Sequence, residues 1–243
     1  MRQTKSVCPE CKRVIIALIF EENGKVIMEK DCPEHGNFRD VCWSDAELYK
    51  KFENYFYKGI GVSNFQNVSK ANCPFDCGIC SAHETGTLLA NIDVTNRCNL
   101  SCAVCFANAK TKGFVCEPSF EEIRKMMEAL REEKPVPCSA IQFSGGEPTV
   151  RDDLPQIIEL AEEMGFAHIQ IASNGVNLAK STEYCKKLRD ATLRTIYLSF
   201  DGVSPEPYLE KEGFNALPLK KKAIENCRNF GPESIVLVPT LAK

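Results

Sequence analysis

From about residue 90 onward, hydrophobic and polar positions follow one repeated pattern. A short run rich in Ile, Val and Phe is followed by a small-polar or Gly turn, and then by a segment with apolar residues at helical spacing. The runs that we predict to be strands cover residues 91–94, 140–143, 168–171, 195–200 and 234–238. Strands that alternate with helices over short connections lie parallel, with right-handed crossovers. The pattern therefore predicts a (βα) barrel or a partial barrel.

The segments between these runs carry helix start and stop signals. Ser119, with Glu122 three residues later, forms a capping box just before a run of apolar residues at helical spacing. Further helices are expected at residues 152–165, 181–190 and 218–230, and Pro and Gly mark the ends of the first and the last of these. The Lys run at 220–222 is expected on the solvated face of the last of these helices.

The first 89 residues have a different pattern. Two apolar runs, at 14–20 and 25–29, flank Asn23-Gly24, and an Asn-Gly pair between such runs is a hairpin signal. Residues 45–70 hold a short helix and several aromatic residues, which helical spacing favours as core packing; a lipid or partner surface is the alternative. These aromatic residues are Tyr49, Phe52, Tyr55, Phe56 and Tyr57. We therefore expect three regions, at 1–45, 46–89 and 90–243.

Composition narrows the class of protein. The chain has 243 residues, of which 44% are hydrophobic and 26% are charged, as in ordinary globular proteins. It has no apolar run of 18 residues and no signal peptide, which favours a cytoplasmic protein. The formal net charge of −3 offers no electrostatic footprint for nucleic acid.

Cysteine is the unusual feature of the composition. Fourteen cysteines in a chain without an export signal favour metal binding over disulfides, because a reducing cytosol keeps thiols free. Six of them form two CxxxCxxC triplets. The triplets are Cys73, Cys77 and Cys80, and Cys98, Cys102 and Cys105. Three thiolates are one fewer than a fully capped cluster needs, so each triplet either takes a ligand from elsewhere or leaves one position open.

A separate metal site is predicted in the first region. Cys8 and Cys11 precede the hairpin, and Cys32 and His35 follow it, as in a zinc ribbon with three thiolates and one imidazole. Cys42 could replace His35 and give a rubredoxin-like site for iron or zinc, with zinc favoured. The remaining four cysteines are expected to be small buried hydrophobic residues. They are Cys116, Cys138, Cys185 and Cys227.

The polar turns after the strands should share one rim, because reactive groups in a βα barrel gather at the carboxyl ends of the strands. CNLSCAVC follows the first strand, GlyGlyGluPro ends the second, and SerAsnGly and SerPheAspGly turns come after them. Over residues 90–240 this order resembles the radical S-adenosylmethionine (SAM) enzymes. The resemblance implies that Cys98, Cys102 and Cys105 hold a four-iron four-sulfur (4Fe–4S) cluster whose fourth iron binds SAM. Reductive cleavage of SAM would then give a 5′-deoxyadenosyl radical.

The rim residues have expected roles in this reading. Gly145 and Gly146 would let the backbone approach SAM closely, and Glu147 and the neighbouring backbone carbonyls would receive its ammonium group. By resemblance, Ser173, Asn174, Ser199 and Asp201 are candidates for contacts with its carboxylate and ribose; turn formation is the alternative role for these four. The second triplet, at 73–80, is expected to hold an auxiliary iron–sulfur cluster completed by His83 or a distant cysteine, with a structural knuckle as the alternative.

The order of motifs along the whole chain is similar to that of the archaeal tetraether lipid synthases and their close relatives. This implies carbon–carbon coupling of archaeal lipid tails, a lipid substrate, contact with the membrane surface and a low-potential electron donor of the ferredoxin or flavodoxin type. That family's barrel has six strands and a long C-terminal region, so we expect the chain to be a fragment. A radical SAM methylase or peptide-modifying enzyme is the first alternative, and a non-catalytic iron–sulfur or zinc module is the second.

Overall fold

The computed structural model describes residues 2–57, 59–65, 67, 78–81, 83–109 and 113–241. These form two compact units, Met1–Thr85 and Gly86–Lys243.

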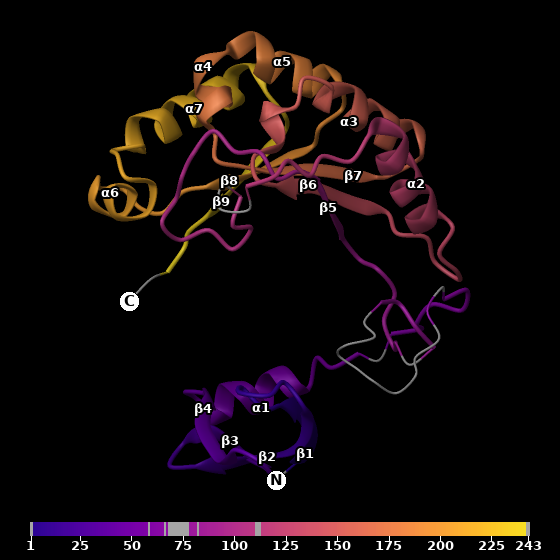
Figure 1. Ribbon diagram of the computed structural model, residues 1–243, viewed down its shortest axis with the longest axis vertical. Helices are drawn as coiled ribbons and strands as arrows, with labels where there is room; N and C mark the ends of the chain where they lie inside the picture. The colour runs from indigo at the N-terminus through magenta and orange to yellow at the C-terminus, as the bar shows by residue number, and fades with distance from the viewer. Residues whose placement is uncertain are drawn as a thin grey trace. The chain divides into compact units, whose positions relative to one another are not determined.

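The first unit is built on a four-stranded antiparallel sheet (Figure 1). Its strands, paired in chain order, are β1 (Arg2–Val7), β2 (Val14–Glu22), β3 (Lys25–Cys32) and β4 (Gly36–Trp43). The predicted hairpin is confirmed: Glu22 pairs with Lys25, and both Asn23 and Gly24 have positive φ, as a tight turn of this kind requires. Strands β1 and β4 were not predicted, because few of their apolar residues are buried and their pattern carries no clear strand signal.

A short helix, α1 (Ala46–Glu53), follows the sheet and is capped by Asp45, whose side chain accepts from the N–H of Leu48. The aromatic residues around it do not all form a core, contrary to expectation. Phe52 is 53% exposed, and Tyr55, Phe56 and Tyr57 are at least 74% exposed. The reason is that α1 ends at Glu53, so the last three no longer follow helical spacing.

The second unit contains a five-stranded parallel sheet in chain order, and the predicted partial barrel is confirmed. The strands are β5 (Ala90–Thr95), β6 (Ala140–Gly145), β7 (His168–Ser173), β8 (Thr195–Ser199) and β9 (Ser234–Val238). Helices form an arc over one face of this sheet (Figure 1). They are α2 (Phe120–Arg131), α3 (Leu154–Glu163), α4 (Val176–Lys180), α5 (Thr182–Asp190), α6 (Glu206–Glu212) and α7 (Leu217–Phe230). The predicted capping box at Ser119 and Glu122 opens α2.

The two faces of the parallel sheet differ in chemistry. Alternate residues such as Ile141, Phe143 and Ile169 are completely buried in the core beneath the helices. The residues between them point to the other face, because successive side chains in a strand alternate. On that face, Gln142 Nε2 donates to Asn91 Oδ1 at 2.7 Å, and Gln170 donates to Gln142. The concave side of the partial barrel is therefore lined by polar groups near β5, β6 and β7.

Candidate cofactor and metal sites

The loop that carries Cys98, Cys102 and Cys105 begins directly after β5, and the GlyGlyGlu turn after β6 fixes it. Gly146 N donates to the carbonyl of Thr95 at 2.7 Å, and Glu147 N donates to the carbonyl of Arg97 at 2.9 Å. A Cβ atom on Gly145 would lie 2.1 Å from the Thr95 carbonyl oxygen. The glycines are thus required by contact with the chain's own backbone, and their approach to SAM stays a prediction.

Glu147 is buried and bound by groups of its own chain. It is 1% exposed, and its carboxylate accepts from the Thr149 N–H and hydroxyl, from Ser173 Oγ at 2.8 Å and from Asn174 N at 2.7 Å. Burial raises the pKa of Glu147, while these hydrogen bonds oppose the shift. A carboxylate engaged in this way connects the ends of β6 and β7. The contact of this turn with the ammonium group of SAM stays a prediction.

Asn174, just after β7, contacts the loop that carries the three cysteines. Its side-chain nitrogen donates to Asn99 Oδ1 at 2.7 Å and reaches Cys98 Sγ at 3.8 Å. A second donor, the backbone N–H of Leu100, lies 3.4 Å from the same sulfur. Donors directed at sulfur are typical of thiolates that hold iron–sulfur clusters, and such hydrogen bonds help set the cluster potential.

The three thiols of this loop suit a cluster. Cys98 and Cys102 are half-buried and Cys105 is exposed. Burial raises the pKa of Cys102, and neighbouring charges, of which Glu212 is the largest, contribute smaller shifts. The donor set of three thiols beside the carboxyl end of β5 therefore fits a 4Fe–4S cluster with one open iron.

Ser199 and Asp201 lie near the carboxyl end of β8, but Lys211 engages both. Lys211 Nζ lies 2.9 Å from Asp201 Oδ2 and donates to Ser199 Oγ at 3.2 Å. Thr240 N also donates to Asp201, at 2.8 Å. Burial raises the pKa of Asp201, but the bonds from Lys211 and Thr240 outweigh burial and the net shift is downward. Asp201 thus connects the ends of β8 and β9, and the contacts of Ser199 and Asp201 with SAM stay a prediction.

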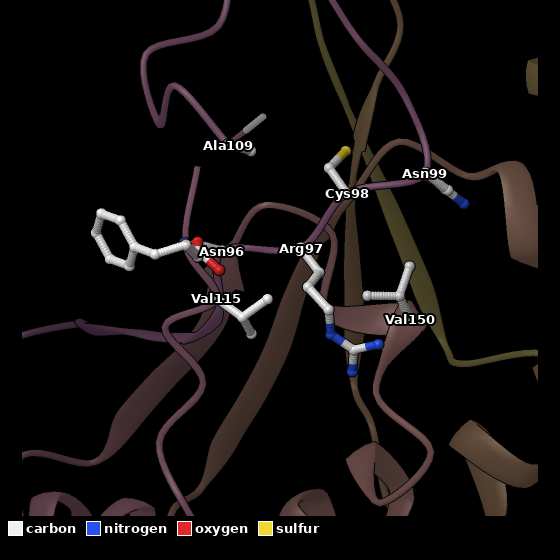
Figure 2. Close-up of a pocket in the computed structure, with 8 residues that line it drawn as sticks. Asn96, Arg97, Cys98, Asn99, Ala109, Val115 and Val150 are labelled. Carbon is white, nitrogen blue, oxygen red and sulfur yellow. The ribbon is translucent and has the colours of Figure 1, made fainter. Parts of the chain in front are cut away.

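A pocket of about 390 Å³ opens beside Cys98, within the range of small-molecule sites (Figure 2). In the close-up, the side chains of Arg97 and Val150 lie near each other, and the sulfur of Cys98 points away from them. The complete lining is Asn96, Arg97, Cys98, Asn99, Ala109, Phe114, Val115 and Val150. Arg97 is held in place by Glu117, whose carboxylate accepts from its Nε at 2.7 Å.

In the first unit, the four predicted metal ligands come together. The ligand atoms of Cys8, Cys11, Cys32 and His35 all lie within 4.8 Å of one another, as a single tetrahedral ion requires. Cys42 is exposed and is not part of this group, so the imidazole and not the fourth thiol completes it. Hydrogen bonds from the Glu34 backbone and then His35 lower the pKa of Cys32 to about 6, which favours the thiolate that a metal binds.

The auxiliary triplet is only partly visible. Cys73 and Cys77 lie outside the described residues. Cys80 Sγ lies 3.3 Å from His83 Nδ1, so these two groups are neighbours. Of the other cysteines, Cys138, Cys185 and Cys227 are buried as predicted, whereas Cys116 is exposed because it lies in the extended segment before α2.

Sequence reasoning missed three charged residues that shape the rim. Arg151 donates to the carbonyls of Val94 and Pro118, and Lys211 engages the end of β8. Lys220, expected on a solvated face, is completely buried. No sequence motif marks these three residues as part of the rim. Lys220, for example, is the first of three consecutive lysines, and only the tertiary packing shows that it is the buried one.

No helix among the described residues is both long and apolar enough to cross a bilayer.

Comparison with known proteins matches both units to families. The radical SAM superfamily model matches residues 92–241, and a model described as the HMPTM N-terminal zinc ribbon domain matches residues 1–44. Methylornithine synthase, as a crystal structure, aligns with 61% of this chain and 43% of its own at a TM-score of 0.50 and 16% identity. That likeness shows the fold alone.

Two curated relatives are similar in sequence. A 7,8-dihydro-6-hydroxymethylpterin dimethyltransferase from Methanocaldococcus jannaschii is 58% identical over 243 residues, which are 100% of this chain and 47% of that protein. A probable GTP 3′,8-cyclase from Methanococcus maripaludis is 32% identical over 140 residues, 58% of this chain and 45% of that protein. The chain thus spans about half the length of the curated relatives it matches.

These findings correct the more specific resemblance. The relative that matches the whole chain is named as a pterin dimethyltransferase, so the expected likeness to tetraether lipid synthases is not supported. The broader assignment holds, because the superfamily model covers the cysteine loop, the GlyGlyGlu turn and all five parallel strands except the first residues of β5. The superfamily implies a 4Fe–4S cluster and SAM, and the ribbon implies a metal site. The chain belongs to the radical SAM superfamily.

Proposed function

We propose that this protein acts on a pterin as a radical SAM methyltransferase. The observation that carries the proposal is the polar lining of the concave face of the parallel sheet at β5, β6 and β7. A lipid tail would need an apolar lining, because burying unpaired polar groups against hydrocarbon is costly. A pterin has ring nitrogens, an amino group and a carbonyl that match hydrogen-bonding side chains.

The polar groups form two rows across the sheet. One row joins Asn91, Gln142 and Gln170 through their side-chain amides. The other, closer to the carboxyl ends of the strands, pairs Asp93 with Ser144, whose hydroxyl donates to Asp93 Oδ1 at 2.6 Å. Asp93 is exposed, so its carboxylate can accept further hydrogen bonds from a substrate.

The names of the relatives support the same class of substrate. The relative at 58% identity is named for a dihydropterin, and the relative at 32% identity is named for GTP. A pterin and the guanine ring of GTP are both flat bicyclic rings with the same pattern of amino and carbonyl groups. Nothing in the fold or the relatives favours lipid-tail coupling over this reading.

The cofactors would supply hydrogen-atom abstraction from an unactivated carbon. Cys98, Cys102 and Cys105 would hold the cluster, and the pocket beside Cys98 would leave room for a small molecule next to it. A low-potential electron donor of the ferredoxin or flavodoxin type would reduce the cluster. The 73–80 triplet would hold an auxiliary iron–sulfur cluster, and the ribbon would hold zinc.

The proposal is tested by hydrogen transfer. The protein is reconstituted anaerobically with iron and sulfide, reduced, and given SAM with 7,8-dihydro-6-hydroxymethylpterin deuterated on its carbons. We expect deuterium in the 5′-deoxyadenosine, measured by mass spectrometry. A Cys98→Ala variant is the matched control and should give no 5′-deoxyadenosine. Deuterium transfer from a deuterated archaeal ether lipid but not from the pterin would overturn the proposal.

A further inference from the structure

A buried lysine and glutamate lie behind the candidate cofactor site and have no assigned role. Lys220, on α7, is completely buried, and the side chain of Glu212, at the end of α6, is 1% exposed. Lys220 Nζ lies 2.8 Å from Glu212 Oε1. The second carboxylate oxygen, Oε2, is buried without a hydrogen-bond partner among the described residues. A buried ion pair with an unsatisfied oxygen is weak evidence for a stabilising role, because desolvation offsets the attraction.

The same lysine reaches the cluster loop through Asn174. Nζ of Lys220 donates to the carbonyl of Asn174 at 2.8 Å. On its other side, Asn174 is held by Glu147, which accepts from its backbone N–H at 2.7 Å. Both backbone groups of Asn174 are therefore fixed by buried charged side chains, and its side-chain nitrogen is left directed at Asn99 and Cys98.

We infer that Lys220 is a positioning residue, which holds Asn174 so that its amide donates to the sulfur of Cys98. A donor to a cluster thiolate withdraws negative charge from the cluster and raises its reduction potential. Lys220 touches neither the cluster nor SAM in this role. It acts through the backbone of Asn174, and Glu212 compensates its charge in the buried site.

This inference requires the 4Fe–4S cluster of the proposed function but not its pterin substrate. It is therefore tested by the reduction potential of the cluster. The double variant Lys220→Met, Glu212→Gln removes the contact without leaving a buried unpaired charge. It is made in a background with Cys73, Cys77 and Cys80 replaced by Ala, so that one cluster is observed. Iron content establishes that the cluster is loaded, and the midpoint potential is measured by titration monitored by electron paramagnetic resonance (EPR).

We expect the midpoint potential of the double variant to shift to a more negative value, in the same direction as that of Asn174→Ala. Lys222→Met, on the exposed face of the same helix, is the matched control and should leave the potential unchanged. A shift in Asn174→Ala without a shift in the double variant would overturn the role of Lys220, and unchanged potentials in both would overturn the hydrogen bond to Cys98. If the double variant fails to fold, Lys220→Gln takes its place, because its shorter side chain keeps a polar group in the buried site but withdraws the donor from the Asn174 carbonyl. Its potential is expected to shift in the same direction as that of Asn174→Ala, and an unchanged potential beside a shifted one in Asn174→Ala would contradict the inference.

Discussion

The hydroxyl of Ser173 donates a hydrogen bond to Oε1 of Glu147 at 2.8 Å, which ties the end of β7 to the turn after β6. Glu147 also accepts from Asn174 N and from Thr149, so one buried carboxylate holds together two of the loops at the rim. The GlyGlyGlu turn thus fixes the cysteine loop by hydrogen bonds, in addition to being a motif of the family.

Replacing Glu147 by Gln should destabilise the second unit. An amide nitrogen cannot accept, so at least one donor now aimed at the carboxylate would be left buried and unpaired, at a cost of about 1–3 kcal/mol. The free energy of unfolding is measured by urea titration followed by circular dichroism. Glu163→Gln, on an exposed position of α3, is the matched control and should change little. Equal stability of the two variants would contradict the internal role of Glu147.

Metal binding by the ribbon should depend on Cys32 and not on Cys42. Cys32→Ser removes one of the four ligands that lie within 4.8 Å of one another, whereas Cys42 is exposed and outside that group. The two thiol-to-hydroxyl changes are chemically identical and serve as controls for each other. Metal content by elemental analysis should fall in the first variant and stay unchanged in the second. Loss of metal in Cys42→Ser would show that the wrong fourth ligand has been assigned.

The metal-free ribbon should become less stable as the pH falls from about 8.5, the ordinary pKa of a thiol, to about 6, the pKa of Cys32 in the folded chain. The folded state favours the Cys32 thiolate, so its contribution is present above the unfolded pKa and lost as the pH falls through the folded one. Trp43, the one tryptophan of the chain, lies in this unit, and its fluorescence follows unfolding in the presence of a chelator. Cys32→Ser should flatten this dependence; a dependence of the same size in the variant would assign it to another group.

On the pterin proposal, Asp93→Asn should weaken substrate binding. A carboxylate that accepts from an amino or ring N–H group contributes about 1.5–3 kcal/mol, so the dissociation constant should rise about 10- to 100-fold. Binding of the dihydropterin is measured by fluorescence or calorimetry. Asp190→Asn, at the exposed end of α5, should leave the affinity unchanged. An unchanged affinity in Asp93→Asn would show that the concave face at β5 does not contribute to pterin binding.

Some elements could be predicted from the sequence because the apolar and polar pattern of a few neighbouring residues matches their burial in the folded chain. The five parallel strands are short apolar runs, and the Ser119 capping box and the Asn23-Gly24 turn depend on neighbouring residues alone. The four ribbon ligands lie at the two ends of one hairpin, so their meeting also follows from local structure.

The remaining features depend on contacts between distant residues, which leave no local signal. Strands β1 and β4 are mostly exposed and polar, and α6 is too short to show a helical period. The rim residues were correctly placed at the ends of the strands, but their partners were not foreseen. Glu147 accepts a hydrogen bond from Ser173, and Asp201 forms an ion pair with Lys211. A buried carboxylate needs such donors, and only the folded chain brings them together.

The central claim is that Cys98, Cys102 and Cys105 hold a cluster with an open iron at which SAM binds. The most direct test is the EPR spectrum of the reduced, reconstituted protein with and without SAM, in the background lacking Cys73, Cys77 and Cys80. We predict a 4Fe–4S signal that changes when SAM is added and disappears when Cys98, Cys102 and Cys105 are replaced by Ala. A signal that SAM leaves unchanged, or one that survives loss of these three cysteines, would contradict the account.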